Sequence, residues 1–199
     1  MLESVDFSAK KLSKKAYKPE WDQLMERLVV LQQQAHSAGI GLVVLFEGWN
    51  GAGKGSRISD LMYNLDARST SVYVTPDVEV DREREFAGRS SGVTGFYPLM
   101  QEFWKALGER NSITFYDRGW YSTAMQHMMS NAPAKLLMPK ADERHYTESI
   151  RDFERQLVAD GYVVVKFFLH VTKEGQRQRL ERLHDDPATR CRVSEGKMK

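Results

Sequence analysis

The chain has 199 residues, of which 41% are apolar, and its formal net charge is +2. This length and apolar content can bury one sizeable core, so we expect a single domain over residues 1–199. The nearly balanced charge argues against a general nucleic-acid coat. The single cysteine, Cys191, excludes an intrachain disulfide and suits a reducing compartment. Because no apolar run approaches the roughly 20 residues that span a bilayer, and the start does not open a signal peptide, we expect a cytoplasmic protein without nucleic-acid or membrane partners.

The first predicted element is a helix whose apolar residues recur at helical spacing. The stripe consists of Trp21, Leu24, Met25, Leu28 and Leu31, and we interpret it as core packing. Two glycines near residue 40 can stop this helix and turn the chain into a strand at 42–46. Residues 1–40 are therefore predicted to form a basic segment and a helix.

A glycine-rich segment follows that strand and precedes a helix-like stretch at 58–65. Residues 48–54 fit the pattern G-x-x-x-x-G-K, in which glycines let backbone N–H groups turn toward phosphate oxygens. We expect Lys54 to face solvent as a mobile positive charge, and Gly55 stands where a Ser or Thr would ligate Mg²⁺. The flanking strand and helix favour a phosphate-binding loop over a structural glycine turn. The residues predicted to bind phosphate or nucleotide in this loop are Gly48, Gly51, Ala52, Gly53, Lys54, Gly55 and Ser56.

The rest of the chain alternates strands with helices. Strands are predicted at 71–75, 112–116 and 162–169, and helices at 96–107, 119–129, 142–159 and 173–183. The mixed charges and small residues of 77–95 predict a long mobile connection. This alternation predicts an α/β fold in which a mainly parallel sheet is covered by helices on both faces, as a three-layer α/β/α arrangement.

The third predicted strand delivers an aspartate and an arginine, Asp117 and Arg118. Ligands bind at the carboxyl ends of parallel strands, where we expect both this pair and the glycine-rich loop. Asp117 suits Mg²⁺, which prefers one or two carboxylates plus phosphate oxygens, and the planar charge of Arg118 suits a transferring phosphoryl group. The alternatives are a helix N-cap at Asp117 and a surface ion pair at Arg118. The loop upstream favours the functional interpretation.

Arginines crowd the last quarter of the chain at positions 177, 179, 182 and 190. Phosphoryl-transfer enzymes often carry such charges on a lid that closes over the phosphates, so residues 170–199 are predicted to form a lid in which Arg179 and Arg182 bind phosphate. The alternative is an ordinary solvated helix face stabilised by Lys173, Glu174 and Glu181. The spacing alone leaves both open.

Three motifs in this order resemble polyphosphate kinase family 2. They are Gly48-x-Asn50-x-Ala52-Gly53-Lys54-Gly55, the block Asp117-Arg118-Gly119-Trp120-Tyr121, and Lys173-Glu174-x-Gln176-x-x-Arg179 with Asp185-Asp186-Pro187. The segment 97–107, together with Glu47-Gly48-Trp49, is most similar to the polyphosphate:AMP phosphotransferase branch, whose members often fuse two such domains. The similarity runs over residues 12–194.

This resemblance implies a thymidylate-kinase-like P-loop fold and Mg²⁺-dependent transfer of a phosphoryl group between inorganic polyphosphate and a nucleotide. By position, Lys54 would hold phosphates, Asp117 would hold Mg²⁺, Arg118 would stabilise the transferring group and Arg179 would belong to the lid. AMP and ADP are the candidate nucleotides, with guanine nucleotides as a further option. We also expect a homo-oligomer.

The chain departs from the family pattern at a few positions. The family usually has aspartate where this chain has Asn50, which we count as a fourth candidate catalytic residue because its amide keeps the hydrogen-bonding shape without the charge. Ser is common where this chain has Gly119, Trp where it has Cys191, and an acidic pair where it offers Asp77 and Glu79. The sequence also stops before the last helices expected of this fold, as a fragment or one half of a two-domain protein would.

Three functions are therefore carried forward. The first is a polyphosphate:nucleotide phosphotransferase. The second, motivated by Asn50, is a weakened or silent P-loop module that binds polyphosphate or nucleotide for regulation or assembly. The third is an ATP-dependent nucleotide kinase. The sequence does not decide between AMP and ADP, between adenine and guanine, or the direction of transfer.

Overall fold

The computed structural model describes residues 13–76, 100–129 and 143–190. Its centre is a four-stranded sheet in the order β2-β3-β1-β4, and every neighbouring pair is parallel. The strands are β1 (Gly41–Gly48), β2 (Thr70–Val74), β3 (Ile113–Asp117) and β4 (Tyr162–Leu169). The predicted α/β class with a parallel sheet is confirmed.

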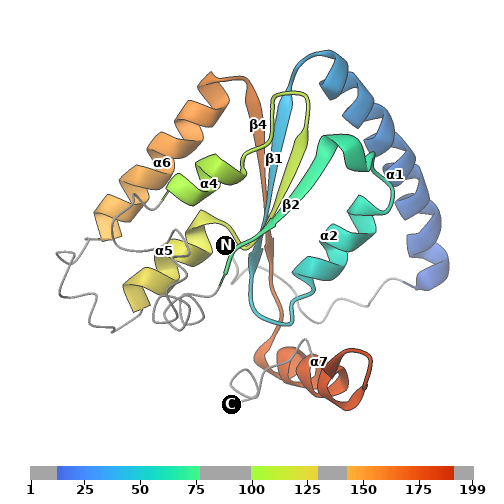
Figure 1. The fold of residues 1–199 in the computed structure, drawn as a ribbon. Helices are drawn as coiled ribbons and strands as arrows, with labels where there is room; N and C mark the ends of the chain where they lie inside the picture. Colours follow the sequence, from blue (N-terminus) through green and yellow to red (C-terminus); the bar gives the residue numbers. More distant parts are fainter. Residues whose placement is uncertain (1–12, 77–99, 130–142, 191–199) are drawn as a thin grey trace.

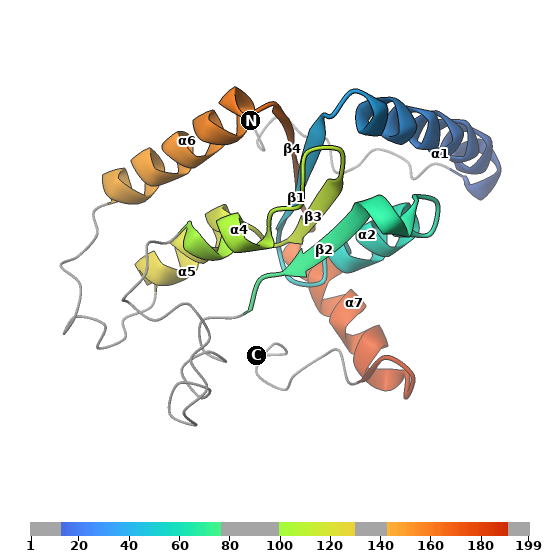
Figure 2. The ribbon, with the colours of Figure 1, turned by 45° about the horizontal axis from the view of Figure 1, so that its top comes forward.

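Helices cover both faces of this sheet, which gives the predicted three layers. In Figures 1 and 2, α1 and α2 lie on one side of the strands, and α4, α5 and α6 lie on the other. Helix α7 lies below the sheet, next to the carboxyl ends of the strands (Figure 1). The helices are α1 (Lys14–Ser37), α2 (Lys54–Met62), α4 (Gln101–Ala106), α5 (Trp120–Met129), α6 (Glu143–Ala159) and α7 (Lys173–Asp185).

Two apolar clusters follow from the alternation of side chains along the strands. On one face, Val43 and Leu45 of β1 pack with Trp120 of α5 and Phe153 of α6. On the other face, the intervening residues of β1 pack with Ile58 of α2. The centre of the sheet is thus buried on both sides, which explains the continuous apolar runs of these strands.

The predicted core stripe of α1 is wrong in part. Met25 is buried, but Leu24 and Leu31 are 51% and 48% exposed. These two leucines lie on the flank of the helical stripe, so the face that meets the sheet cannot include them. The polar residue Gln32 is buried on this helix instead. Its side-chain oxygen accepts a hydrogen bond from the Asp66 N–H at 3.0 Å, which satisfies the buried polar group.

One helix boundary differs from the sequence prediction, and some predicted segments lie outside the described residues. Helix α2 begins at Lys54, four residues before the predicted start, because the glycine-rich loop ends directly in the helix. The connection predicted at 77–95 and the first residues of the helix predicted at 96–107 lie outside the described residues, as does Cys191. Within the described ranges, no helix is long and apolar enough to cross a membrane.

Candidate active site

The strand register brings the predicted site residues to one edge of the sheet. Asp117 at the end of β3 is the partner of Phe46 in β1 and of Val74 in β2. Gly48, which ends β1 and begins the phosphate loop (residues 48–56), is the partner of Leu169 in β4. The loop and the turn formed by Asp117 and Arg118 (the Asp117/Arg118 turn) therefore lie side by side, as parallel strands require.

The backbone of the phosphate loop explains its glycines. Gly48, Gly51 and Gly53 have φ angles of 122°, 72° and 99°. At Gly48 a Cβ would lie 2.1 Å from the Leu169 carbonyl oxygen, so no other residue fits there. Gly53 is the N-cap of α2 and supplies no side-chain hydrogen bond, which leaves the first N–H groups of the helix facing the loop.

Lys54 is placed differently from the prediction that it faces solvent. The side chain is buried, with 7% exposure, and its ammonium group donates to the carbonyl oxygens of Gly48 at 2.9 Å and Trp49 at 3.1 Å. An ammonium ion that leaves water must be hydrogen-bonded, and these two carbonyls are acceptors within its reach. The positive charge therefore sits inside the loop that is predicted to hold phosphate.

The Asp117/Arg118 turn is held by both neighbouring strands. The Arg118 N–H donates to the Phe46 carbonyl at 3.0 Å, and the Thr75 N–H donates to the Asp117 carbonyl at 3.2 Å. The guanidinium of Arg118 donates to the Thr75 carbonyl at 2.9 Å, and the Thr75 hydroxyl donates to the Arg118 carbonyl. Arg118 has a φ of 62°, which is uncommon for a residue with a side chain and persists where surrounding contacts enforce it.

The N-cap alternative for Asp117 does not describe the helix that follows. The N–H groups of Gly119 and Ser122 at the start of α5 donate to Glu47 at 3.0 and 3.3 Å. Asp117 is half-buried, at the end of β3 that faces the phosphate loop. The carboxylate that accepts the first N–H groups of α5 is thus that of Glu47 and not that of Asp117.

The surroundings of Asp117 fit a magnesium ion bound through phosphates. A Cβ placed on Gly55 would lie 3.4 Å from Asp117 Oδ2, in van der Waals contact, so the first turn of α2 lies directly against the carboxylate. Among the described residues, no cluster of three or more His, Cys, Asp or Glu could hold a metal by itself. Mg²⁺ typically uses one or two carboxylates together with substrate phosphates and water, and Asp117 is the candidate for such a carboxylate.

Helix α7 reaches the phosphate loop through two polar side chains. Gln176 donates to the Asn50 carbonyl at 2.7 Å, and Arg179 donates to the carbonyls of Gly51 and Ala52 at 3.3 and 3.1 Å. These contacts put Arg179 at the loop, where the lid interpretation expects it. In this structure its guanidinium donates to backbone carbonyls of the loop.

The other arginines of this region behave as a solvated helix face. Arg177 forms ion pairs with Glu174 and Glu181 at 2.9 and 2.6 Å. Arg182 donates to the Gln178 carbonyl within the same helix at 3.2 Å. The solvated-face alternative therefore describes Arg177 and Arg182 in this structure, and the lid stays a prediction.

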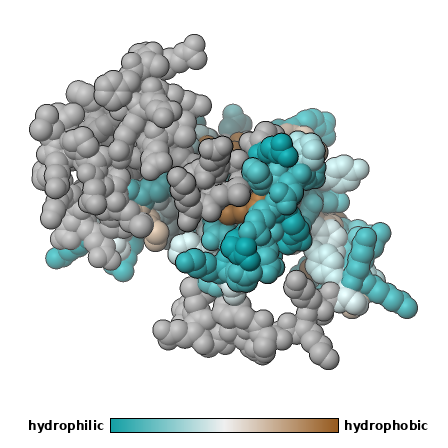
Figure 3. All heavy atoms as spheres, turned by 90° about the horizontal axis from the view of Figure 1, so that it is seen from below, coloured by the Kyte–Doolittle hydropathy of each residue, from teal (hydrophilic) through white to brown (hydrophobic). Residues whose placement is uncertain are grey.

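The remaining predicted residues, Asn50 and Ser56, are exposed on the phosphate loop and on the first turn of α2. Figure 3 views the molecule from below, from the side of the strand ends, and shows mostly hydrophilic described residues on this face. Sequence reasoning missed Glu47 and Thr75, which hold the Asp117/Arg118 turn. The signal for Glu47 was an acidic residue at the end of an otherwise apolar strand.

A polar cluster supports the start of α5 on its outer side. Glu154 of α6 accepts hydrogen bonds from the Trp120 indole at 3.0 Å, the Tyr121 hydroxyl at 2.7 Å and the Lys166 ammonium at 2.9 Å. Burial opposes ionisation, but these three donors together leave the pKa of Glu154 below its usual value. Burial likewise opposes the charge of Lys166, whereas its bonds to Tyr121 and Glu154 raise its pKa.

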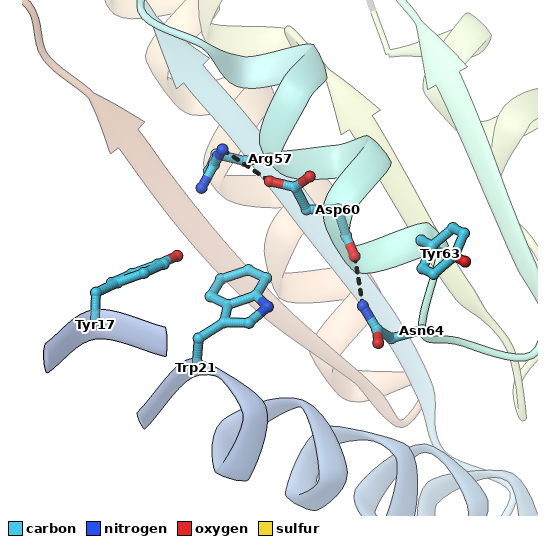
Figure 4. A pocket seen from close by; sticks show the side chains of 6 residues that line it. All are labelled: Tyr17, Trp21, Arg57, Asp60, Tyr63 and Asn64. Atoms are coloured by element: carbon cyan, nitrogen blue, oxygen red, sulfur yellow. Dashed lines mark hydrogen bonds and ion pairs between the residues drawn. The ribbon is translucent and has the colours of Figure 1, made fainter. Parts of the chain in front are cut away.

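A hollow of about 390 Å³ lies elsewhere, between α1 and α2 (Figure 4). On one side of it, the rings of Tyr17 and Trp21 of α1 stack with their centroids 5.7 Å apart. On the other side, the Arg57 guanidinium pairs with the Asp60 carboxylate at 2.8 Å. Its lining includes none of the residues predicted for the site. The residues predicted for the site therefore lie at the strand ends and not in this hollow.

Comparisons with known proteins agree with this geometry. A sequence model of the family described as Polyphosphate kinase 2 (PPK2) matches residues 11–199. The chain is 32% identical over 197 residues to a polyphosphate:AMP phosphotransferase of Pseudomonas aeruginosa, and the match covers 98% of this chain and 36% of that protein. It is 31% identical over 185 residues to a putative GDP-polyphosphate phosphotransferase of Corynebacterium glutamicum, with coverage of 92% and 52%. The chain thus spans about a third to a half of the length of these relatives.

Solved structures show the same fold. A putative polyphosphate kinase 2 from Pseudomonas aeruginosa PA01 superposes with a TM-score of 0.79 at 27% identity, over 98% of this chain and 38% of that one. Polyphosphate Kinase 2 from Arthrobacter aurescens TC1 superposes with a TM-score of 0.78 over 100% of this chain and 67% of that one. The second match, at 20% identity, supports the fold alone.

Proposed function

This chain belongs to the polyphosphate kinase 2 family, and on that premise we propose that it catalyses Mg²⁺-dependent phosphoryl transfer between inorganic polyphosphate and a nucleotide. One observation carries the proposal. The phosphate loop and the Asp117 carboxylate meet at the same edge of the sheet, where a Cβ on Gly55 would lie only 3.4 Å from Asp117 Oδ2. A phosphate cradle beside an acidic strand end is the arrangement that P-loop phosphoryl transfer uses.

In this proposal each residue of the site has a distinct task. The N–H groups of Gly51 and of residues 53–55 and the ammonium of Lys54 bind the phosphate oxygens, while Arg118 stabilises the charge spread over the transferring group. Asp117 would hold Mg²⁺, which neutralises phosphate charge and orders the phosphate oxygens. A P–O bond of the polyphosphate breaks as a phosphate oxygen of the nucleotide forms the new P–O bond.

The names of the relatives guide the choice of nucleotide. The two relatives described above are named for AMP and for GDP. We propose AMP as the first acceptor to test, because the match to the polyphosphate:AMP phosphotransferase agrees with the resemblance of 97–107 and of Trp49 in the sequence. Arg179 would complete the site as part of the lid, exchanging the carbonyls of the phosphate loop for phosphate oxygens.

A transfer assay tests the proposal. The purified chain is incubated with long-chain polyphosphate, Mg²⁺ and separately AMP, ADP, GMP or GDP, and the phosphorylated nucleotide is measured. The Asp117→Asn variant should lose about 10²-fold or more in turnover and lose its response to Mg²⁺, because the amide cannot replace a metal-binding carboxylate. Its thermal stability should change little. Asp60→Asn, on the surface of α2, should leave the Mg²⁺ titration as it is in the unsubstituted chain.

The same assay separates the alternatives. Transfer from ATP but not from polyphosphate would support a nucleotide kinase. The absence of transfer to every nucleotide, combined with thermal protection by polyphosphate, would support the binding module that Asn50 motivates. A Mg²⁺ titration that is unchanged in Asp117→Asn would remove the metal assignment while leaving the phosphate loop in place.

A further inference from the structure

Glu47 is a buried acidic residue whose role is not explained by packing. It lies in β1, one residue before the phosphate loop, and is 7% exposed. A carboxylate in such a position is costly unless hydrogen bonds replace its water shell. Its neighbours along the strand, Leu45 and Phe46, are apolar and buried, so an apolar side chain would be the ordinary choice.

The hydrogen bonds of Glu47 all reach one segment, the start of α5. Oε1 accepts from the Gly119 N–H at 3.0 Å and from the Ser122 N–H at 3.3 Å, and Oε2 accepts from the Ser122 hydroxyl. The first N–H groups of a helix have no partners within the helix and favour a negative charge. Glu47, in strand β1, therefore caps the N-terminus of α5.

This cap joins the two halves of the candidate site. Gly119 directly follows the Asp117/Arg118 turn, and Glu47 directly precedes the phosphate loop. The backbone on the other side of Glu47 is also fixed, since Gly48 contacts the Leu169 carbonyl too closely for a Cβ. Rotation or retreat of the turn would have to break the bonds to Glu47.

The close approach also suits the glycine at position 119. A Cβ on Gly119 would lie 2.9 Å from Leu45 Cδ2 and 3.3 Å from Glu47 Oε1. A residue with a side chain at this position would need those side chains to shift, whereas glycine allows the close approach. Glycine at 119 thus suits the bond to Glu47.

We propose that Glu47 is a positioning residue, which fixes the Asp117/Arg118 turn against the phosphate loop through the start of α5. The proposal rests on the proposed function for its catalytic consequence. The structural consequence, protection of two named amides, does not depend on that function. Misplacement of reacting groups by about 1 Å can cost roughly 10²-fold in rate. Loss of a residue that fixes the turn against the phosphate loop should therefore lower the rate measurably.

Three variants test the role. Glu47→Ala removes both acceptor oxygens, Glu47→Gln keeps one acceptor without the charge, and Ser122→Ala removes only the hydroxyl bond. Hydrogen exchange at the Gly119 and Ser122 amides should quicken by at least about tenfold in Glu47→Ala, by less in Glu47→Gln, and not at Gly119 in Ser122→Ala. The turnover number should fall about 10²-fold in Glu47→Ala and about tenfold in Glu47→Gln, with the KM for polyphosphate unchanged.

The outcomes separate this inference from the proposed function. If the unsubstituted chain transfers no phosphate, the proposed function fails, and amide exchange alone decides the role of Glu47. Exchange at Gly119 and Ser122 that stays as in the unsubstituted chain in both Glu47 variants would overturn the inference, whatever the activity. A loss of thermal stability with an unchanged turnover number of the folded protein would also overturn it. If Glu47→Ala does not fold, Glu47→Gln carries the test.

Discussion

Two arginines stand near the phosphate loop, and the molecule holds them in different ways. Arg118 belongs to a turn whose backbone is hydrogen-bonded to β1 and to Thr75, at a φ of 62° that the surroundings must enforce. Arg179 reaches the loop from α7, with an exposed side chain whose bonds to Gly51 and Ala52 go to backbone carbonyls. Arg118 is fixed by hydrogen bonds of its main chain, whereas Arg179 contacts the loop through its guanidinium.

The difference suits the tasks proposed for the two residues. A group that stabilises a transition state works best when its position is set before the substrate arrives. A lid must instead give up its contacts and form new ones, so it is built from contacts that break easily. The ion pairs of Arg177 with Glu174 and Glu181 keep α7 intact as a helix without tying it to the sheet.

The largest expected effect comes from removing the buried charge of the fixed region. Lys54→Ala should lower polyphosphate-dependent transfer by about 10²-fold or more, because a preorganised charge at the phosphates is lost. Since Lys54 is buried and bonded to the carbonyls of Gly48 and Trp49, the free energy of unfolding should also fall, by about 1–3 kcal/mol. Activity assays with thermal unfolding measure both effects. Lys15→Ala, on the exposed surface of α1, is the matched control. Turnover that survives in Lys54→Ala would remove Lys54 from the site.

A smaller effect is expected from the movable region, where two arginines of one helix provide their own control. Arg179→Ala should lower transfer about tenfold, because one charge of the lid is lost, with little change in thermal stability. Arg177→Ala should change transfer less than twofold, because its bonds lie within α7 and exposed ion pairs contribute about 0–1 kcal/mol. Steady-state kinetics of the two variants decide the point. Equal effects would show that the helix carries a general positive field and that Arg179 has no special place.

The sequence predicted the parts of this molecule that depend on local pattern. Apolar runs and turn residues were enough to place the sheet, the phosphate loop and the pair of Asp117 and Arg118 at one edge. The directions of side chains could not be predicted in the same way, because they depend on contacts between distant segments. Lys54 was expected in solvent and is buried under its own loop. Glu47 was present in a quoted motif, but its partner Gly119 lies 72 residues away, beyond any periodic signal.

The arginines of α7 illustrate the same limit. Arg177 and Arg179 have the same charge on the same helix, and the spacing could not decide between a lid and a solvated face. The surroundings of the two arginines depend on how α7 crosses the phosphate loop. The side chain of Leu180 would lie 3.5 Å from a Cβ on Gly51, and Arg177 pairs with Glu181 of its own helix. The orientation of one element relative to another is a tertiary property, which residue spacing does not encode.

The smallest effect is expected from Glu154, which supports the fixed region from outside the site. Its folded-state pKa lies below the ordinary value of 4.5, so its contribution to stability is present above that pH and is lost as the pH falls through the lower, folded value. Glu154→Gln should therefore lower the unfolding free energy by about 1 kcal/mol at neutral pH and have a diminishing effect below pH 4.5. Transfer activity at neutral pH should stay within about twofold, because the bonds from Glu47 and Thr75 still hold the Asp117/Arg118 turn.

Thermal unfolding of Glu154→Gln across acidic and neutral pH measures this contribution. Asp152→Asn is the matched control on the same helix, since its pair with Arg155 is exposed and should contribute little at any pH. A loss of stability in Glu154→Gln that is the same at every pH would mean that the carboxylate contributes through packing and not through its charge. A loss of activity as large as that of the Glu47 variants would show that the outer cluster of Trp120, Tyr121 and Lys166 also holds the turn. The fixed region would then extend beyond the strand ends to this cluster.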